Sequence, residues 1–187
     1  MIRRALALLL LFATAASTAP LRYQIDAPRS QVAAKVAFFG LASKTAQFPK
    51  MSGGISLVPG KLDAIDLDIS LDAGALVASD RVTTERLRGP KFFDVQRYPT
   101  IRFTGREMTM TSERTARVKG AITARGITRP TELAVTFDQP PAQASGRVPI
   151  GLTASGTIDR ADFGMKAYSL IVGRKVTLTI KAHMVPG

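Results

Sequence analysis

The sequence predicts an all-β fold in one domain, arranged as a sandwich or a barrel. From Tyr23 onward, apolar and polar residues alternate with a period of two, which is the pattern of half-buried strands. Turn signals such as Pro59-Gly60 and Ser145-Gly146 separate the alternating runs. The length of 187 residues fits one domain, and 45% hydrophobic with 21% charged residues are enough to build a core.

About eight alternating runs are expected to form strands. The clearest is 65–72, where four aliphatic side chains share one face and Asp66, Asp68, Ser70 and Asp72 share the other. Such short strands at regular spacing are typical of a sandwich or a barrel. In chain order the expected strands are 32–38, 55–57, 65–72, 101–103, 118–124, 132–137, 148–158 and 176–182.

Residues 79–93 are the exception, because they show no strand alternation. Helix-forming residues end at Gly89-Pro90, which is a normal stop signal, so a short helical segment is expected around residues 82–89. The adjacent aromatics Phe92 and Phe93 follow this segment. They either plug one end of a barrel or anchor the loop to the core.

The first nineteen residues have the anatomy of a secretory signal peptide. Arg3 and Arg4 form a positive start, residues 5–12 are apolar, and small residues run to Ala19. The apolar run is shorter than the roughly 20 residues that cross a bilayer. We therefore expect residues 1–19 to be cleaved, residues 20–187 to form a single domain, and the protein to be exported to the periplasm.

Composition argues against most catalytic sites. The chain has no Cys and one His, His183, so thiol chemistry, disulfides, Cys-based zinc sites and His-rich metal sites are excluded. Asp66, Asp68 and Asp72 resemble a metal cluster by composition, but on a strand they lie on the polar face and more simply aid solubility. No nucleophile, base and orienting group come together in the sequence. No catalytic residue, metal or cofactor is expected, apart from a bound lipid.

The charge is strongly basic. Without Arg3 and Arg4, 24 basic residues face 14 acidic ones, a net charge of +10. Such a surface fits an anionic membrane or an anionic ligand head group, or it simply keeps the protein in solution. The basic residues are dispersed and Trp is absent, so no nucleic-acid partner is expected.

Alternation alone does not say which face of a strand is inside. An outer-membrane barrel also alternates, with its apolar face toward lipid. Aromatic residues make up only 6% of the chain, too few for aromatic girdles at two membrane interfaces. A barrel with its apolar faces inward is therefore the favoured interpretation.

Two stretches carry a specific family resemblance. They are Phe92-Phe93-Asp94-Val95, followed by Tyr98-Pro99, and Ile158-Asp159-Arg160-Ala161-Asp162-Phe163-Gly164-Met165. With these, the chain resembles the YceI-like family of exported, lipocalin-like proteins that bind polyisoprenoid lipids. It departs from the family at Phe38 and Arg86, where members often carry a His.

The resemblance implies a lipocalin-like, eight-stranded antiparallel barrel whose interior holds a long isoprenoid chain. An eight-stranded barrel is either filled by side chains or holds one ligand. Small residues on the apolar faces favour a cavity: Ala34, Gly120, Ala124, Ala154, Gly156 and Ala182. The candidate lipid contacts are Ala34, Phe38, Leu67, Ile69, Leu71, Phe92, Phe93, Ile101 and Phe103.

The expected function is that of an exported soluble binding protein, which sequesters or carries a long-chain isoprenoid of polyprenyl or isoprenoid-quinone type. The alternatives are a structural or stress-response periplasmic protein and an enzyme that acts on such a lipid. Transient membrane contact and a homodimer are both compatible with the sequence. It leaves open the chain length, the head group, the physiological role, the oligomeric state and the cleavage site.

Overall fold

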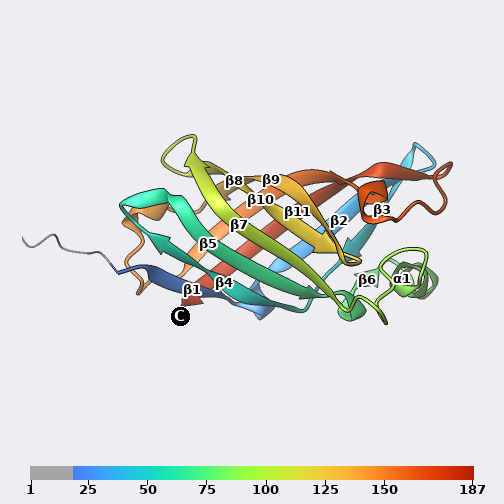
Figure 1. The fold of residues 1–187 in the computed structure, drawn as a ribbon, viewed down its shortest axis with the longest axis horizontal. Coiled ribbons are helices and arrows are strands. Elements are labelled where there is room, and N and C mark those ends of the chain that lie inside the picture. Colours follow the sequence, from blue (N-terminus) through green and yellow to red (C-terminus); the bar gives the residue numbers. More distant parts are fainter. Residues whose placement is uncertain (1–18) are drawn as a thin grey trace, which may run out of the picture.

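The computed structural model describes residues 19–187, which form an elongated β-barrel with one short α-helix at one end (Figure 1). The bounds of its β segments are β1 Leu21–Ile25, β2 Gln31–Phe38, β3 Ala42–Gln47, β4 Met51–Val58, β5 Lys61–Asp72, β6 Val77–Ala78, β7 Thr100–Met110, β8 Thr115–Ala124, β9 Ile127–Phe137, β10 Ile150–Asp159 and β11 Val172–Pro186. The helix α1 spans Arg81–Arg88, and the four 3-10 turns are η1 Ala27–Arg29, η2 Ala73–Ala75, η3 Pro141–Gln143 and η4 Arg160–Phe163.

These eleven segments make eight barrel strands, because three strands are interrupted. β1 and β2 lie in succession along the same edge of β11, where Ile25 pairs with Met184 and Gln31 with Lys181. β4 pairs with β1, and β3 pairs with β2. On the next strand of the barrel, β5 pairs with β4 and β6 pairs with β3. All pairs are antiparallel, and the β1–β11 pairing closes the ring. The predicted eight-stranded antiparallel barrel is confirmed, and a sandwich is excluded.

The expected strands and the helix match the structure, apart from some bounds. α1 lies at Arg81–Arg88 where 82–89 was expected, and Asp80 caps it by accepting the backbone N–H of Thr83. The run expected at 148–158 begins at Ile150, so Val148 lies outside the strand. β1 and β3 were not expected as strands. β3 reads ASKTAQ and has no apolar alternation, so it is a strand through its pairing with β2 and β6.

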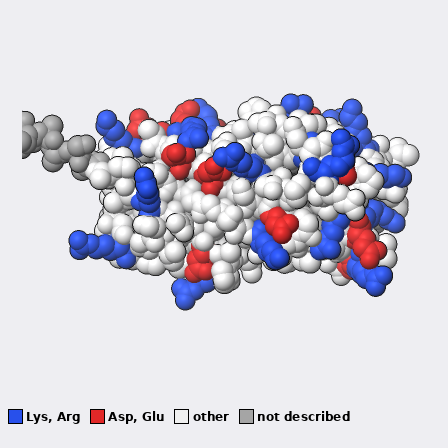
Figure 2. All heavy atoms as spheres, turned by 60° about the horizontal axis from the view of Figure 1, so that its bottom comes forward, with Lys and Arg blue, Asp and Glu red and all other residues white. Residues whose placement is uncertain are grey.

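The apolar faces point inward and the charged faces outward. On the outside, Asp66 pairs with Arg106 and Asp68 with Arg102 across the β5–β7 pair. Figure 2 shows such red and blue side chains next to one another along the barrel wall. The Arg102 guanidinium, mainly through its hydrogen bond, lowers the pKa of Asp68. Asp66 and Asp68 therefore each form a surface ion pair with an arginine, as expected of solubilising residues.

Two absences apply to the described part of the chain, residues 19–187. No three His, Asp or Glu side chains gather as a metal site requires. No helix has both the length and the apolar composition needed to span a membrane.

Close approach of three strands explains the pair Gly53-Gly54. A Cβ atom on Gly54 would lie 2.1 Å from the carbonyl oxygen of Tyr23 on β1, and one on Gly53 would lie 2.1 Å from that of Asp68 on β5. Gly53 also has a φ of +114°, a conformation that favours glycine. These two glycines let β4 lie tightly between β1 and β5 in the curved wall.

Candidate functional site

The barrel encloses an apolar cavity of about 580 Å³. One end of the interior, beneath the β4–β5 and β7–β8 turns, is closed by a packed cluster that includes Ile65, Met108, Val118 and Phe137. Farther along the barrel, inward side chains such as Leu67, Ile69 and Ile101 are only partly buried although they face the interior. A filled core would bury them, so the middle of the barrel is open space rather than packed protein.

All nine candidate lipid contacts lie on the wall of this one cavity. β2 places Ala34 and Phe38 there, and Phe92 and Phe93 reach it from the segment after α1. The other five line it from two neighbouring strands: Leu67, Ile69 and Leu71 on β5, and Ile101 and Phe103 on β7. Their contact with a lipid remains a prediction.

The small inward residues divide into two groups. Ala34, Ala124, Ala154 and Ala182 line the cavity. Gly120 and Gly156 do not, because neighbouring atoms occupy the space that a side chain there would take. A Cβ on Gly120 would lie 2.1 Å from the backbone carbonyl oxygen of Thr104 and 2.9 Å from Cζ of Phe103, and one on Gly156 would lie 2.6 Å from Cδ2 of Leu133. The expectation that both glycines widen the cavity is wrong; Gly120 allows the close approach of β7 and Phe103, and Gly156 makes room for Leu133.

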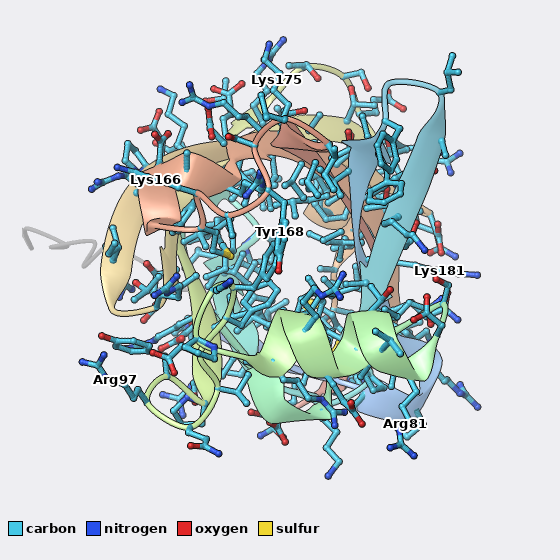
Figure 3. All side chains as sticks on the ribbon, turned by 90° about the vertical axis from the view of Figure 1, so that its right-hand side faces the viewer. Arg81, Arg97, Lys166, Tyr168, Lys175 and Lys181 are labelled. Carbon is cyan, nitrogen blue, oxygen red and sulfur yellow. The ribbon has the colours of Figure 1, made fainter. Side chains whose placement is uncertain are left out.

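The polar side chains on the cavity wall gather at the end that α1 covers. They are Lys44, Thr45, Asp80, Thr83, Arg86, Arg160 and Tyr168. Figure 3 looks into this end, where Tyr168 lies near the centre above α1. We call this end the mouth: it is bounded by the β2–β3 turn (39–41), α1 and the 164–171 loop. The cavity is thus apolar along its length and polar at its mouth.

Tyr168 is the centre of a cationic and aromatic cluster at the mouth. Its ring stacks on Phe92 with the centroids 6.1 Å apart. The guanidinium of Arg86 and Nζ of Lys91 lie 5.6 and 5.5 Å from the Tyr168 centroid. Such distances fit cation–π attraction. The cluster ties α1 and the segment after it to the 164–171 loop.

Lys44 forms the opposite side of the mouth. Its Nζ lies 3.5 Å from a carboxylate oxygen of Asp80 and 5.5 Å from the centroid of the Phe38 ring. Lys44 and Phe38 together give this wall an aromatic ring beside a cation. Sequence reasoning did not identify Lys44, because β3, on which it lies, shows no apolar alternation.

Arg160 is buried, with 4% of its surface exposed, and it faces the cavity from η4. Nε donates to the carbonyl of Gly173 and Nη2 to that of Val172, both at 2.8 Å, while Nη1 donates to the carbonyl of Met165. Burial lowers the pKa of Arg160. Its neighbour Asp159 instead pairs with Arg174, at 2.8 Å. Arg160 therefore holds both ends of the 164–171 loop and keeps a positive charge at the inner mouth.

Asp80 holds the start of α1 over the mouth, and this contact depends on pH. Hydrogen bonds from the backbone N–H and then the hydroxyl of Thr83 lower the pKa of Asp80 from 3.8 to about 2. A carboxylate whose pKa falls on folding stabilises the fold above its unfolded pKa, and this contribution is lost as pH falls through the folded value.

We expect Asp80→Ala to lower the melting temperature at pH 6, and we expect the difference from wild type to disappear as pH falls from about 4 to about 2. Thermal melts of both proteins across this range measure it. The control is Asp63→Ala, an exposed carboxylate at the opposite end, which should match wild type throughout. A difference at Asp80 that stays constant down to pH 2 would contradict the capping role.

Comparison with known proteins places this architecture among relatives. The model of the YceI-like domain matches residues 23–184. The "UPF0312 protein" of Pseudomonas putida strain F1 is 26% identical over 132 residues, which are 71% of this chain and 69% of the relative.

Two solved structures share the fold. BcnA of Burkholderia cenocepacia superposes with a TM-score of 0.75 at 18% identity, covering 85% of this chain and 98% of BcnA. A polyisoprenoid-binding domain of Saccharophagus degradans gives a TM-score of 0.70 at 14% identity, covering 89% and 99% of the two chains.

Proposed function

The chain belongs to the YceI-like family, and from this premise we propose that it is an exported binding protein that holds a long-chain isoprenoid lipid inside its barrel. The observation that carries the proposal is the apolar cavity of about 580 Å³ with its polar groups confined to one end. This volume lies within the usual range of about 300–1,000 Å³ for ligand sites. The similarity in fold to the polyisoprenoid-binding domain of Saccharophagus degradans supports the same ligand class.

The shape of the interior favours a linear apolar chain. β5 has 12 residues and at about 3.4 Å per residue extends for roughly 40 Å, and the barrel is elongated along its strands (Figure 1). Aliphatic and aromatic side chains line the middle of this length, and within residues 19–187 no polar side chain there can pair with a ligand's hydrogen-bonding groups. A polyprenyl chain or the tail of an isoprenoid quinone has the matching composition.

The mouth fits an anionic or carbonyl-bearing head group. Lys44, Arg86 and Arg160 bring three cationic groups to the polar end of the cavity wall. Burying the chain removes apolar surface from water at about 25 cal/mol per Å², but the same lipid in a membrane is already in an apolar medium. Selectivity therefore depends on cavity shape and on these head-group contacts.

We propose sequestration or transport of the lipid, and not its chemical conversion. Among the described residues on the cavity wall, Asp80 is the one carboxylate, and it is engaged by Thr83 and Lys44. General acid–base catalysis usually needs a positioned group whose pKa is near the working pH, whereas the pKa of Asp80 is about 2.

One preparation tests export and lipid binding together. We expect protein from a periplasmic extract to lack some 15 to 19 N-terminal residues by intact mass, and its organic extract to contain an isoprenoid by mass spectrometry. Residues 1–18 lie outside the described residues, so the proposed leader rests on the sequence. Full-length protein in the cytosol would contradict export, and periplasmic protein free of isoprenoid would contradict the bound lipid.

A further inference from the structure

Large apolar side chains are exposed at the mouth of the barrel. Leu41 and Leu170 are 100% and 98% exposed, and Phe39 and Val82 are 63% and 62% exposed. They come from the three segments that bound the mouth. At the opposite end, the described part of the chain exposes one such residue, Val148. A patch confined to one end of a molecule indicates a contact surface more strongly than scattered apolar residues do.

These apolar tips surround the entrance to the cavity. The backbone N–H of Phe39 donates to the carbonyl of Ile171 at 2.8 Å, which joins the β2–β3 turn to the loop that carries Leu170. The ion pair between Lys44 and Asp80 joins the same wall to the start of α1, next to Val82. Figure 1 shows the three segments together at the right-hand end of the barrel.

We call the three segments that bound the mouth the rim: the β2–β3 turn (39–41), α1 and the 164–171 loop. Two aromatic residues of the rim have a backbone conformation that aromatic residues rarely adopt. Phe39 and Tyr168 have φ angles of +53° and +55°. This left-handed region is uncommon for bulky residues, and Gly or Asn occupies it at lower cost. Residues held in such conformations cluster at ligand-binding and functional sites. Position 39 therefore carries an exposed aromatic ring although its backbone conformation favours Gly or Asn.

The rim is also basic. Apart from the buried Arg160 and Asp94, the segments that meet at this end, 39–44, 79–99, 124–129 and 159–175, carry 11 basic and 4 acidic residues. Figure 3 shows Arg81, Lys166 and Lys175 around the opening, and Figure 2 shows blue side chains gathered over the right-hand end. Surfaces that bind in the head-group region of anionic membranes have this composition, with exposed apolar side chains surrounded by Lys and Arg.

We propose that this rim docks the barrel, mouth first, on an anionic lipid bilayer. Phe39, Leu41 and Leu170 enter the boundary between head groups and acyl chains, and the surrounding basic residues contact the lipid phosphates. Docked in this way, the cavity opens directly onto the membrane. The inference goes beyond the proposed function, since the docking surface is independent of what the cavity holds.

The experiment measures co-sedimentation of the chain without its first 19 residues with two kinds of vesicle. One is an equimolar mixture of phosphatidylglycerol and phosphatidylcholine, the other is phosphatidylcholine alone, and both lack isoprenoids. The test variant combines Phe39→Asn with Leu170→Ser, and the matched control is Val148→Ser at the opposite end. Asn favours the backbone conformation at position 39, so the test variant should melt no lower than wild type.

We expect wild type and Val148→Ser to bind the anionic vesicles and to leave them as salt rises. The test variant should bind them at least about tenfold more weakly, because two large apolar side chains no longer enter the bilayer. Equal binding by the test variant, or equal binding to both vesicle types, would overturn the proposal. A dimer in solution that the test variant abolishes, together with no vesicle binding by wild type, would assign the rim to a second copy instead. Failure of docking in protein that carries an isoprenoid would leave the proposed function intact.

Discussion

Replacing Ala34 with tryptophan is expected to remove most of the bound lipid while leaving the barrel nearly as stable as wild type. Ala34 lies on β2 between Leu178 on β11 and Ala46 on β3, and its methyl group faces the cavity. An indole at this position extends into open space that a ligand would otherwise occupy. Filling a packed core in the same way costs about 1–3 kcal/mol.

The control for this experiment is Ala116→Trp. Ala116 is 2% exposed, belongs to the packed cluster at the closed end, and does not line the cavity. We expect this variant to lose about 1–3 kcal/mol or more of stability, because no space receives the indole. Thermal melts and isoprenoid content by mass spectrometry are measured for both variants. A destabilised Ala34→Trp protein with wild-type lipid content would show that the interior is packed and that lipid binds elsewhere.

The strands of the wall could be predicted from the sequence because each records its environment in its own pattern. The run 65–72 faces the interior with one side and water with the other, so its residues alternate without exception. Closure into a barrel could not be predicted from alternation, since a sandwich has the same pattern. The prediction of a closed barrel depended on the family resemblance, because that resemblance implies how the strands are arranged together and not only the pattern of each strand.

The cavity wall could be predicted for the same reason, and the mouth could not. The nine candidate residues are apolar positions of alternating strands or of the Phe92-Phe93 motif, and all reach the cavity. Lys44 and Arg86 reach the mouth through a strand without apolar alternation and a helix without buried residues. Their placement depends on contacts between segments far apart in the chain, for which the local sequence holds no signal.

The inward glycines show a second limit. Gly120 and Gly156 were expected to leave space, and by residue type alone that inference is reasonable. In the structure the carbonyl of Thr104 and the ring of Phe103 occupy that space at Gly120, and Leu133 occupies it at Gly156. Volume inside a barrel is a property of neighbouring strands together, so the size of a single residue does not determine it.

Arg160→Met is expected to destabilise the protein by about 3 kcal/mol. The guanidinium donates to three carbonyls, those of Met165, Val172 and Gly173. Methionine keeps the length and the apolar stem of the side chain but donates nothing. Each buried carbonyl left without a donor costs about 1–3 kcal/mol. The substitution also removes the buried positive charge of Arg160, whose desolvation is unfavourable, and this offsets part of the loss.

The loss should be visible in thermal and urea unfolding. In a domain of this size, about 3 kcal/mol corresponds to a fall in melting temperature of roughly 6–12 °C. Arg160→Lys should lie between wild type and Arg160→Met, because an ammonium reaches fewer of the carbonyls from a single nitrogen. The matched control is Arg174→Met, which removes a 63% exposed guanidinium paired with Asp159 and should cost at most about 1 kcal/mol. If Arg160→Met melts with Arg174→Met, the 164–171 loop is held by its apolar contacts, among them buried Met165, and Arg160 serves the mouth by its charge alone.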